Sequence, residues 1–183
     1  MLTPRRNALL IVLCSAFGLA GLTRRAVHVD HYHDLGKLLF GFVIFWAYIA
    51  FSQFMLIWYG NIPEETIWFE HRWHGGWVGV SLVLFVGNFV FPFFLLLPRT
   101  VKRLAPLLAP IAVWLLVMHY VDIYWLVVPS AGEGHGFFHW SDILIAIGMG
   151  CLYFAALVWR LARVPVVPVG DPFLEESMKL DLH

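Results

Sequence analysis

The chain has 183 residues and a formal net charge of zero, with 12 Lys and Arg against 12 Asp and Glu. Hydrophobic residues make up 61% of it and charged residues only 13%, against roughly 25% charged in soluble domains. This composition argues against a soluble domain, and the balanced charge gives no support to nucleic-acid binding. The chain is predicted to be an all-α integral membrane protein, because long apolar runs with few charges are typical of bilayer spans.

Five apolar segments follow one another along the chain: residues 7–22, 36–59, 77–97, 104–128 and 143–162. A helix needs about 20 residues to cross ~30 Å of hydrocarbon, with a lower limit near ~17. The last four segments reach this length, and the first is short for a span. None of the five alternates apolar and polar residues as a barrel strand does. The sequence therefore predicts a bundle of four transmembrane helices and a short fifth helix at the N-terminus.

The same pattern divides the chain into three parts: a short N-terminal helix or remnant over residues 1–25, the helical bundle over 26–165 and a tail over 166–183. Arg5 and Arg6, followed by the apolar run 8–22, also fit a signal peptide. Cleavage would leave the second segment starting on the wrong side of the membrane. We therefore favour a short helix, or the remnant of a longer domain.

Basic residues indicate the orientation of the bundle. Arg99, Lys102 and Arg103 lie between the third and fourth segments, and Arg160 and Arg163 follow the fifth. The opposite side has Arg72 among several glutamates and is rich in Trp. By the positive-inside rule, the C-terminus is predicted to be cytoplasmic, and loops 60–76 and 129–142 to face outward.

Cysteine is almost absent from the sequence. Cys14 and Cys151 lie inside apolar segments and form no Cys-x-x-Cys motif. This excludes covalent haem attachment and an iron–sulfur site built from this chain alone. Any electron carrier is therefore expected in a partner.

Polar residues within the apolar segments are the first candidates for function. His119 and Asp122 are three positions apart and so share a helix face, ~4–5 Å and ~9 Å outward of the segment centre. Gln53 lies ~8–9 Å outward in the second segment, so the three side chains are expected to meet. One interpretation is a proton-conducting or quinol-facing polar chain, because His and Asp can exchange protons near neutral pH. The other is that His119 bonds Asp122 or Gln53 and holds helices together.

A titratable cluster precedes the second segment and includes His31, His33, Asp34 and Lys37. It can be interpreted as an entrance that collects protons from solvent. Alternatively, Asp34 caps the helix by accepting from free backbone N–H groups, and Lys37 extends to the interface.

The two outer loops contain His71-x-x-His74 and His135-x-x-x-His139. No metal or haem site is predicted, because His119 is the only histidine inside an apolar segment and the loops are rich in glycine. These loops are instead expected to dock a partner. The candidate contacts are Glu70, His71, Arg72 and Trp73.

Prolines interrupt two of the apolar segments. Pro92 and Pro110 are expected to bend their helices, because proline cannot donate a backbone hydrogen bond. A bend widens a bundle locally and can admit water beside Asn88 or His119.

Four stretches of the sequence resemble one known family. They are DLGKLLFGFVIFWAYIAFSQFMLIWYGNIPEET (34–66), HRW (71–73), MHYVDIYWLVVP (118–129) and VPVGDPFLEES (167–177). Together they resemble the F subunit of bacterial alternative complex III, also called quinol:cytochrome c oxidoreductase quinone-binding subunit 2. The resemblance covers roughly residues 26–180, which corresponds to the C-terminal half of the usual family length.

The resemblance implies a membrane subunit related to the polysulfide-reductase-type anchors, in the bacterial cytoplasmic membrane. Its expected partners are a homologous membrane C subunit, an iron–sulfur subunit and a multihaem cytochrome c subunit. The complex, respiratory or photosynthetic, would oxidise quinol, and this subunit would have no redox centre of its own. The polar residues inside the matched stretches are Asp34, Lys37, Gln53, His119 and Asp122, and they are the candidates for proton translocation.

Two other functions remain open at this point. One is a purely structural membrane anchor whose polar residues only pack helices together. The other is a separate b-type cytochrome, which is disfavoured because a buried haem needs two axial ligands at matched depth.

Overall fold

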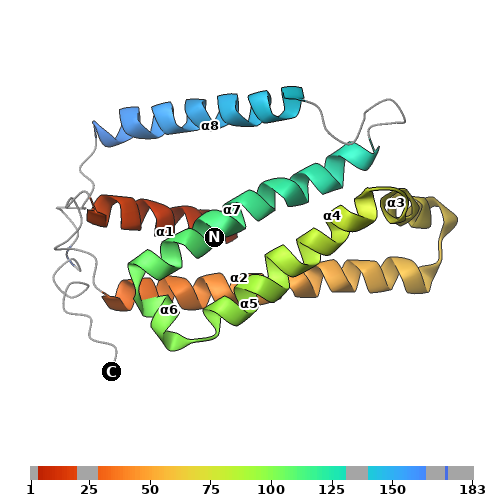
Figure 1. Ribbon diagram of the computed structural model, residues 1–183, viewed down its shortest axis with the longest axis horizontal. Helices are drawn as coiled ribbons and strands as arrows, with labels where there is room; N and C mark the ends of the chain where they lie inside the picture. Colours follow the sequence, from red (N-terminus) through yellow and green to blue (C-terminus); the bar gives the residue numbers. More distant parts are fainter. Residues whose placement is uncertain (1–3, 20–28, 131–139, 164–171, 173–183) are drawn as a thin grey trace.

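The computed structural model describes residues 4–19, 29–130, 140–163 and 172, and within these ranges the chain is helical and has no strand (Figure 1). Four stretches are long and apolar enough to cross a membrane, as the sequence predicted: Val29–Gly60, Trp77–Leu96, Ala105–Ser130 and Trp140–Arg160. The elements are α1 (Pro4–Leu19), α2 (Val29–Gly60), α3 (Pro63–Trp73), α4 (Trp77–Leu84), a π-helix η1 (Phe85–Val90), α5 (Phe91–Leu96), α6 (Arg99–Arg103), α7 (Ala105–Val127), a 3₁₀ turn η2 (Val128–Ser130) and α8 (Trp140–Leu161).

The bundle has two distinct ends. The basic end carries α6 and the start of α2, and the α3 end carries α3 and the last turns of α2 (Figure 1). At 1.5 Å per residue, the 32 residues of α2 are ~48 Å long, which exceeds ~30 Å of hydrocarbon. In a membrane, α2 therefore extends beyond the apolar layer. Most of the predicted tail, 166–183, lies outside the described residues.

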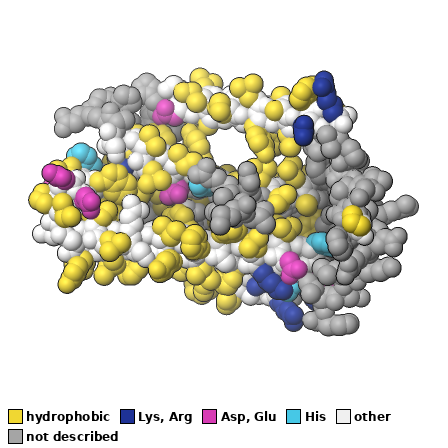
Figure 2. Space-filling model, turned by 180° about the vertical axis from the view of Figure 1, so that it is seen from behind, with side chains coloured by type: hydrophobic (Ala, Val, Ile, Leu, Met, Phe, Trp, Pro, Cys, Tyr) yellow, Lys and Arg dark blue, Asp and Glu magenta, His cyan; other side chains and the backbone are white. Residues whose placement is uncertain are grey.

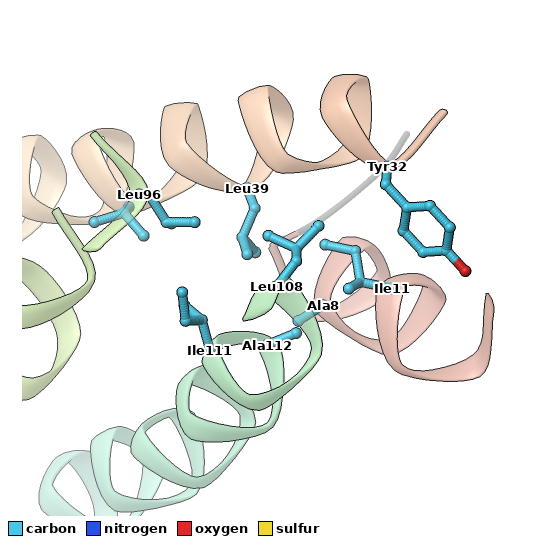
Figure 3. Packing of buried hydrophobic residues seen from close by; sticks show 9 residues of the cluster. Ala8, Ile11, Tyr32, Leu39, Leu96, Leu108, Ile111 and Ala112 are labelled. Atoms are coloured by element: carbon cyan, nitrogen blue, oxygen red, sulfur yellow. The ribbon is translucent and has the colours of Figure 1, made fainter. Parts of the chain in front are cut away.

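The short N-terminal helix expected from the sequence is α1, and it packs most extensively on α7. Figure 3 shows Ala8 and Ile11 of α1 against Leu108 and Ala112 of α7, with Leu39 of α2 beside them. Ala8 and Ala112 are almost completely buried. Small residues at such a contact let two helix backbones approach closely, and van der Waals packing then stabilises the pair in an apolar solvent.

Most of the connection over residues 60–76, which the sequence analysis treated as a loop, forms the helix α3. Pro63 occupies the first turn, where its missing N–H costs nothing. Glu64 and Glu65 lie in the first turn and Arg72 in the last, so that their charges match the helix dipole. In Figure 1, α3 is viewed along its axis and lies across the end of the bundle.

The third span is not a continuous α-helix, because η1 separates α4 from α5. The N–H of Phe91 donates to the carbonyl of Val86, five residues back. Pro92, next along the chain, cannot donate at all. The effect of Pro92 in this structure is thus a local change to π-helical hydrogen bonding. Such segments are frequent at functional sites.

Helix α8 stands apart from the other spans (Figure 1), and Figure 2 shows an opening between it and the rest of the molecule. In the most apolar 18-residue stretch of this helix, no residue is buried. The hydrogen bonds described for it come from Tyr120, to the backbone carbonyl of Asp142 at 3.2 Å, and from Tyr124, to the Asp142 carboxylate at 3.3 Å. All of these contacts lie at its N-terminal end.

Gly36 of α2 packs directly against Lys102 of α6, and substituting it tests this packing. A Cβ at this position would lie 2.9 Å from Cβ and Cγ of Lys102 and 3.3 Å from its Cα. We expect Gly36→Ala to lower the free energy of unfolding by about 1–3 kcal/mol, because the added methyl must push α6 away. Thermal unfolding in detergent, followed by circular dichroism, measures this. Gly41→Ala is the matched control on the same helix, since nothing lies within 4 Å of its added Cβ. A loss of stability of equal size in both variants would contradict the expected clash.

Candidate functional site

A cavity of about 50 Å³ lies between α1, α2, η1 and α7. Its wall is mostly apolar, with three polar side chains: Trp46 of α2, Asn88 of η1 and His119 of α7. Ala8 of α1 also lines it. A cavity needs ~10–15 Å³ of this volume to hold a water molecule, and polar partners to bind it. This cavity meets both conditions.

Asp122 is adjacent to this cavity, one helical turn beyond His119. Its Oδ2 atom accepts a hydrogen bond from Nε1 of Trp46 at 3.3 Å and lies 4.0 Å from Nδ1 of His119. The Asp122 side chain is 13% exposed, and Nε2 of His119 is buried. A carboxylate within a membrane helix costs ~2.5–3.5 kcal/mol on insertion scales unless it faces a partner or water. The Trp46 donor and the nearby imidazole lower this cost for Asp122.

Asn88 is positioned in the cavity wall by the π-helix. It is 7% exposed and belongs to the segment that Pro92 forces out of α-helical geometry. In π-helical geometry, the carbonyl of Gly87 would accept from residue 92, which is a proline. The indole Nε1 of Trp114 donates to this carbonyl instead, at 2.9 Å. Trp114 therefore stabilises the backbone conformation that places Asn88.

Substituting Trp114 tests this role. We expect Trp114→Phe to lower the free energy of unfolding by about 1–2 kcal/mol, because it leaves the buried Gly87 carbonyl without its side-chain donor. Chemical unfolding in mixed micelles gives the value. The control is Trp58→Phe at a tryptophan that is 65% exposed, where little change is expected. Equal losses in the two variants would show that ring size matters and not the hydrogen bond.

The arrangement of Trp46, His119 and Asp122 is suited to proton exchange. Imidazole and carboxylate are the two groups most used for this purpose near neutral pH. The 4.0 Å separation of Nδ1 and Oδ2 is too long for a hydrogen bond, but small rotations or one bridging water can close it. The same contacts also hold α2 against α7, so the geometry is compatible with both interpretations made from the sequence.

Gln53 lies elsewhere, contrary to the expectation that it meets His119 and Asp122. It is exposed on α2, seven residues after Trp46 and thus ~10.5 Å further along the helix. The sequence analysis compared depths counted from the centre of each segment. Because α7 crosses α2 at an angle (Figure 1), residues at equal depth on the two helices do not lie side by side. Trp46 was missed by the sequence analysis. A tryptophan in the middle of an apolar run, far from either interface, was the available signal, since a buried indole N–H needs an acceptor.

Asp34 and Lys37 form an exposed ion pair at the basic end, with 3.1 Å between Nζ and Oδ1. Trp46 is nine residues further along α2 than Lys37, which corresponds to ~13–14 Å of helix. Leu39, two residues after Lys37, already lines the cavity, so an apolar stretch of α2 lies between the ion pair and the polar part of the cavity wall. His33, from the same cluster, is buried.

Of the four candidate docking residues, Glu70, His71 and Trp73 are exposed on α3, whereas Arg72 is 1% exposed. Arg72 is thus committed to contacts within this chain, which corrects its assignment to a docking surface. Its guanidinium donates to the carbonyls of Trp68, Trp125 and Leu126 at 2.6, 3.2 and 2.8 Å, and to Oγ of Ser130 at 3.0 Å. Burial lowers the pKa of Arg72 to about 10, so the side chain remains charged at neutral pH.

The described ranges contain no group of three or more His, Cys, Asp or Glu residues placed to hold a metal ion. His135 and His139 of the second loop motif lie outside the described residues.

Fold and cavity together define the class of protein: a helical bundle suited to a membrane, with a small polar cavity in its core. A comparison with protein-family models gives no match, and a search among curated proteins also gives none.

Proposed function

We propose that the chain is a membrane subunit of a quinol-oxidising complex of the alternative complex III type, without a redox centre of its own. The proposal rests on the sequence resemblance over roughly residues 26–180. The observation that supports it best is the cavity at the bundle core, lined by His119 and adjacent to Asp122. In this proposal, His119 and Asp122 exchange protons through water in the cavity, and Trp46 keeps the Asp122 carboxylate in position.

The proposed partners supply the electron-transfer chemistry. Haem c and iron–sulfur clusters would belong to the cytochrome and iron–sulfur subunits, quinol would be the substrate of the complex, and a homologous C subunit would lie beside this chain in the membrane. Glu70, His71 and Trp73 on the exposed surface of α3 are the proposed docking contacts. Asp34 and Lys37 are the proposed entrance at the basic end, which would face the bacterial cytoplasm together with the C-terminus. Gln53 is exposed on α2 and would contribute to proton transfer only where a partner subunit or water reaches it.

A second candidate function is a purely structural anchor. The hydrogen bond from Trp46 to Asp122 favours it, because this bond joins α2 to α7 directly. In that case Asp122 contributes to helix association and moves no proton.

Co-purification tests the first proposal. The tagged chain is extracted from native membranes in mild detergent, and the eluate is analysed by mass spectrometry and by its haem absorption spectrum. We expect multihaem cytochrome and iron–sulfur subunits to co-elute with it. A tagged membrane protein of similar size, expressed in the same cells, is the control for non-specific capture.

If the chain elutes alone and without haem absorption, the complex is not its partner and the proposal is wrong. If the complex co-elutes, the choice between proton transfer and structural anchoring depends on the substitution of Asp122 described in the Discussion.

A further inference from the structure

The basic end of the bundle contains a group of charged residues whose hydrogen-bonding capacity is only partly used by the residues that the structure describes. Arg99, Lys102 and Arg103 of α6 lie against the first turns of α2, which carry Asp30, His33, Asp34 and Lys37. Figure 2 shows Lys and Arg side chains gathered near this end, with acidic and histidine side chains beside them. Four cationic side chains face two carboxylates here, so the group, called the basic cluster below, carries an excess of positive charge.

The ion pairs within the basic cluster leave much of this charge unsatisfied. Arg103 lies 3.6 Å from the Asp30 carboxylate, which is beyond ordinary hydrogen-bond distance, and its side chain is 41% exposed. Lys37 forms an ion pair with Asp34, and both side chains are exposed. Arg99 is exposed as well. Donors at the surface of the basic cluster are therefore open to an external acceptor.

Two buried polar atoms beneath this surface also need a partner. His33 is 3% exposed, and its Nδ1 atom has no hydrogen-bond partner within the described residues. The same is true of Nε of Arg103. The charges of Lys37, Arg103 and Arg99 act on His33, so the buried imidazole and the exposed cations belong to one electrostatic group. Buried polar atoms of this kind usually pair with protein, water or a bound ligand.

The depth of the basic cluster indicates the ligand. Helix α2 is ~18 Å longer than the hydrocarbon layer, and α7 begins at Ala105, directly after α6. The apolar span Ala105–Ser130 begins directly after α6, so in a membrane the cations of α6 would lie at its boundary, where lipid headgroups begin. Nζ of Lys102 is 5.1 Å from the ring centroid of Phe40, with its stem packed on Gly36, as in a lysine that extends from apolar surface to the headgroup layer.

We propose that the basic cluster binds the phosphate of an anionic phospholipid, with Arg99 and Arg103 as its principal contacts. Guanidinium groups match phosphate oxygens in geometry and charge. The headgroup, directly or through one water, would supply the acceptor that Arg103 and His33 lack. This site is separate from the cavity, and it requires a membrane but not the proposed complex.

The test measures lipid selectivity of the full-length chain. The protein is purified in detergent, supplied with equal amounts of phosphatidylglycerol and phosphatidylcholine, and the lipids that stay bound are quantified by native mass spectrometry. We expect the unmodified chain to prefer phosphatidylglycerol by about fivefold or more. The double variant Arg99→Gln, Arg103→Gln should abolish this preference. The single variant Arg99→Gln, at the exposed arginine, should reduce it.

The matched control removes the same charge from the same end of the bundle. Arg160→Gln with Arg163→Gln changes two arginines at the end of α8, where Arg163 lies over the ring of Trp159 at 4.0 Å. This pair should leave the selectivity within about twofold of the unmodified chain. Circular dichroism and a thermal melt verify the folding of each variant.

Three results would overturn the proposal. Equal losses for the two arginine pairs would mean that the preference follows net charge and involves no specific site. Displacement of the lipid by millimolar inorganic phosphate would assign the site to free phosphate. A large rise in lipid binding after neutralising Asp171, Glu175 and Glu176 would mean that the chain's own acidic tail occupies the basic cluster.

Discussion

Replacing Arg72 with methionine is expected to lower the free energy of unfolding by about 2–4 kcal/mol, one of the two largest effects anticipated for this chain. The side chain joins α3 to the C-terminal end of α7, whose last carbonyls have no intrahelical donors. Arg72 donates to two of them, at Trp125 and Leu126, and its positive charge opposes the negative end of the helix dipole. The guanidinium also lies over the ring of Trp68, at 3.5 Å from its centroid.

Two further variants separate these contributions. Arg72→Lys keeps the charge but cannot donate in several fixed directions, so it should recover only part of the loss. Glu70→Gln, on the exposed surface of the same helix, should change stability by less than about 0.5 kcal/mol. Unfolding of all three in mixed micelles, followed by tryptophan fluorescence, provides the measurement. Full recovery with lysine would show that charge alone matters and that the hydrogen-bond geometry does not.

Replacing Asp122 with asparagine is expected to reduce proton translocation by about tenfold or more if the proposed function is correct. Asparagine has nearly the same shape and still accepts a hydrogen bond from Trp46, but it cannot bind and release a proton. Assembly with the partner subunits should therefore survive. Proton movement is measured in liposomes that contain the purified complex and a pH-sensitive dye, with quinol oxidation followed in parallel.

Asp142→Asn provides the matched control for this experiment. Asp142 is also a carboxylate on a membrane-spanning helix and also accepts a side-chain hydrogen bond, from Tyr124. Tyr124 does not line the cavity, whereas Trp46, which donates to Asp122, does. Its substitution should leave proton translocation unchanged. If Asp122→Asn keeps full proton translocation, the carboxylate does not carry protons. If that variant instead fails to assemble, Asp122 acts by holding α2 against α7, as in the structural alternative.

The membrane spans could be predicted from the sequence because length and apolar composition decide them, and neither depends on the arrangement of the helices. Helix α3 was predictable in principle. Pro63, followed by two glutamates and then by His71 and Arg72, is a typical start and end of a helix. These signals were overlooked because the segment is polar and lies between two spans.

The details of the cavity could not be predicted in the same way. His119 and Asp122 share a helix face by spacing alone, and the structure has them 4.0 Å apart. Which residue of α2 meets them depends on the crossing angle and on the relative shift of two helices, and no local pattern encodes these quantities. This is why Trp46 takes the position that was expected for Gln53. Nothing in the sequence indicated that Arg72 is buried, since two of its acceptors are backbone carbonyls more than 50 residues away.

The attachment of α8 has a mechanical consequence. The helix has 22 residues and is ~33 Å long, and the hydrogen bonds described for it act at one end, on Asp142. The helix is therefore attached at one end, and a rigid-body rotation of it would turn about the tyrosine contacts. Asp142 and Arg160 are ~27 Å apart along the helix, so a rotation of about 10° there would move the Arg160 end by roughly 5 Å, about one helical pitch. A partner that packs into the opening beside α8 would set this angle, and with it the position of the Arg160 end of the helix.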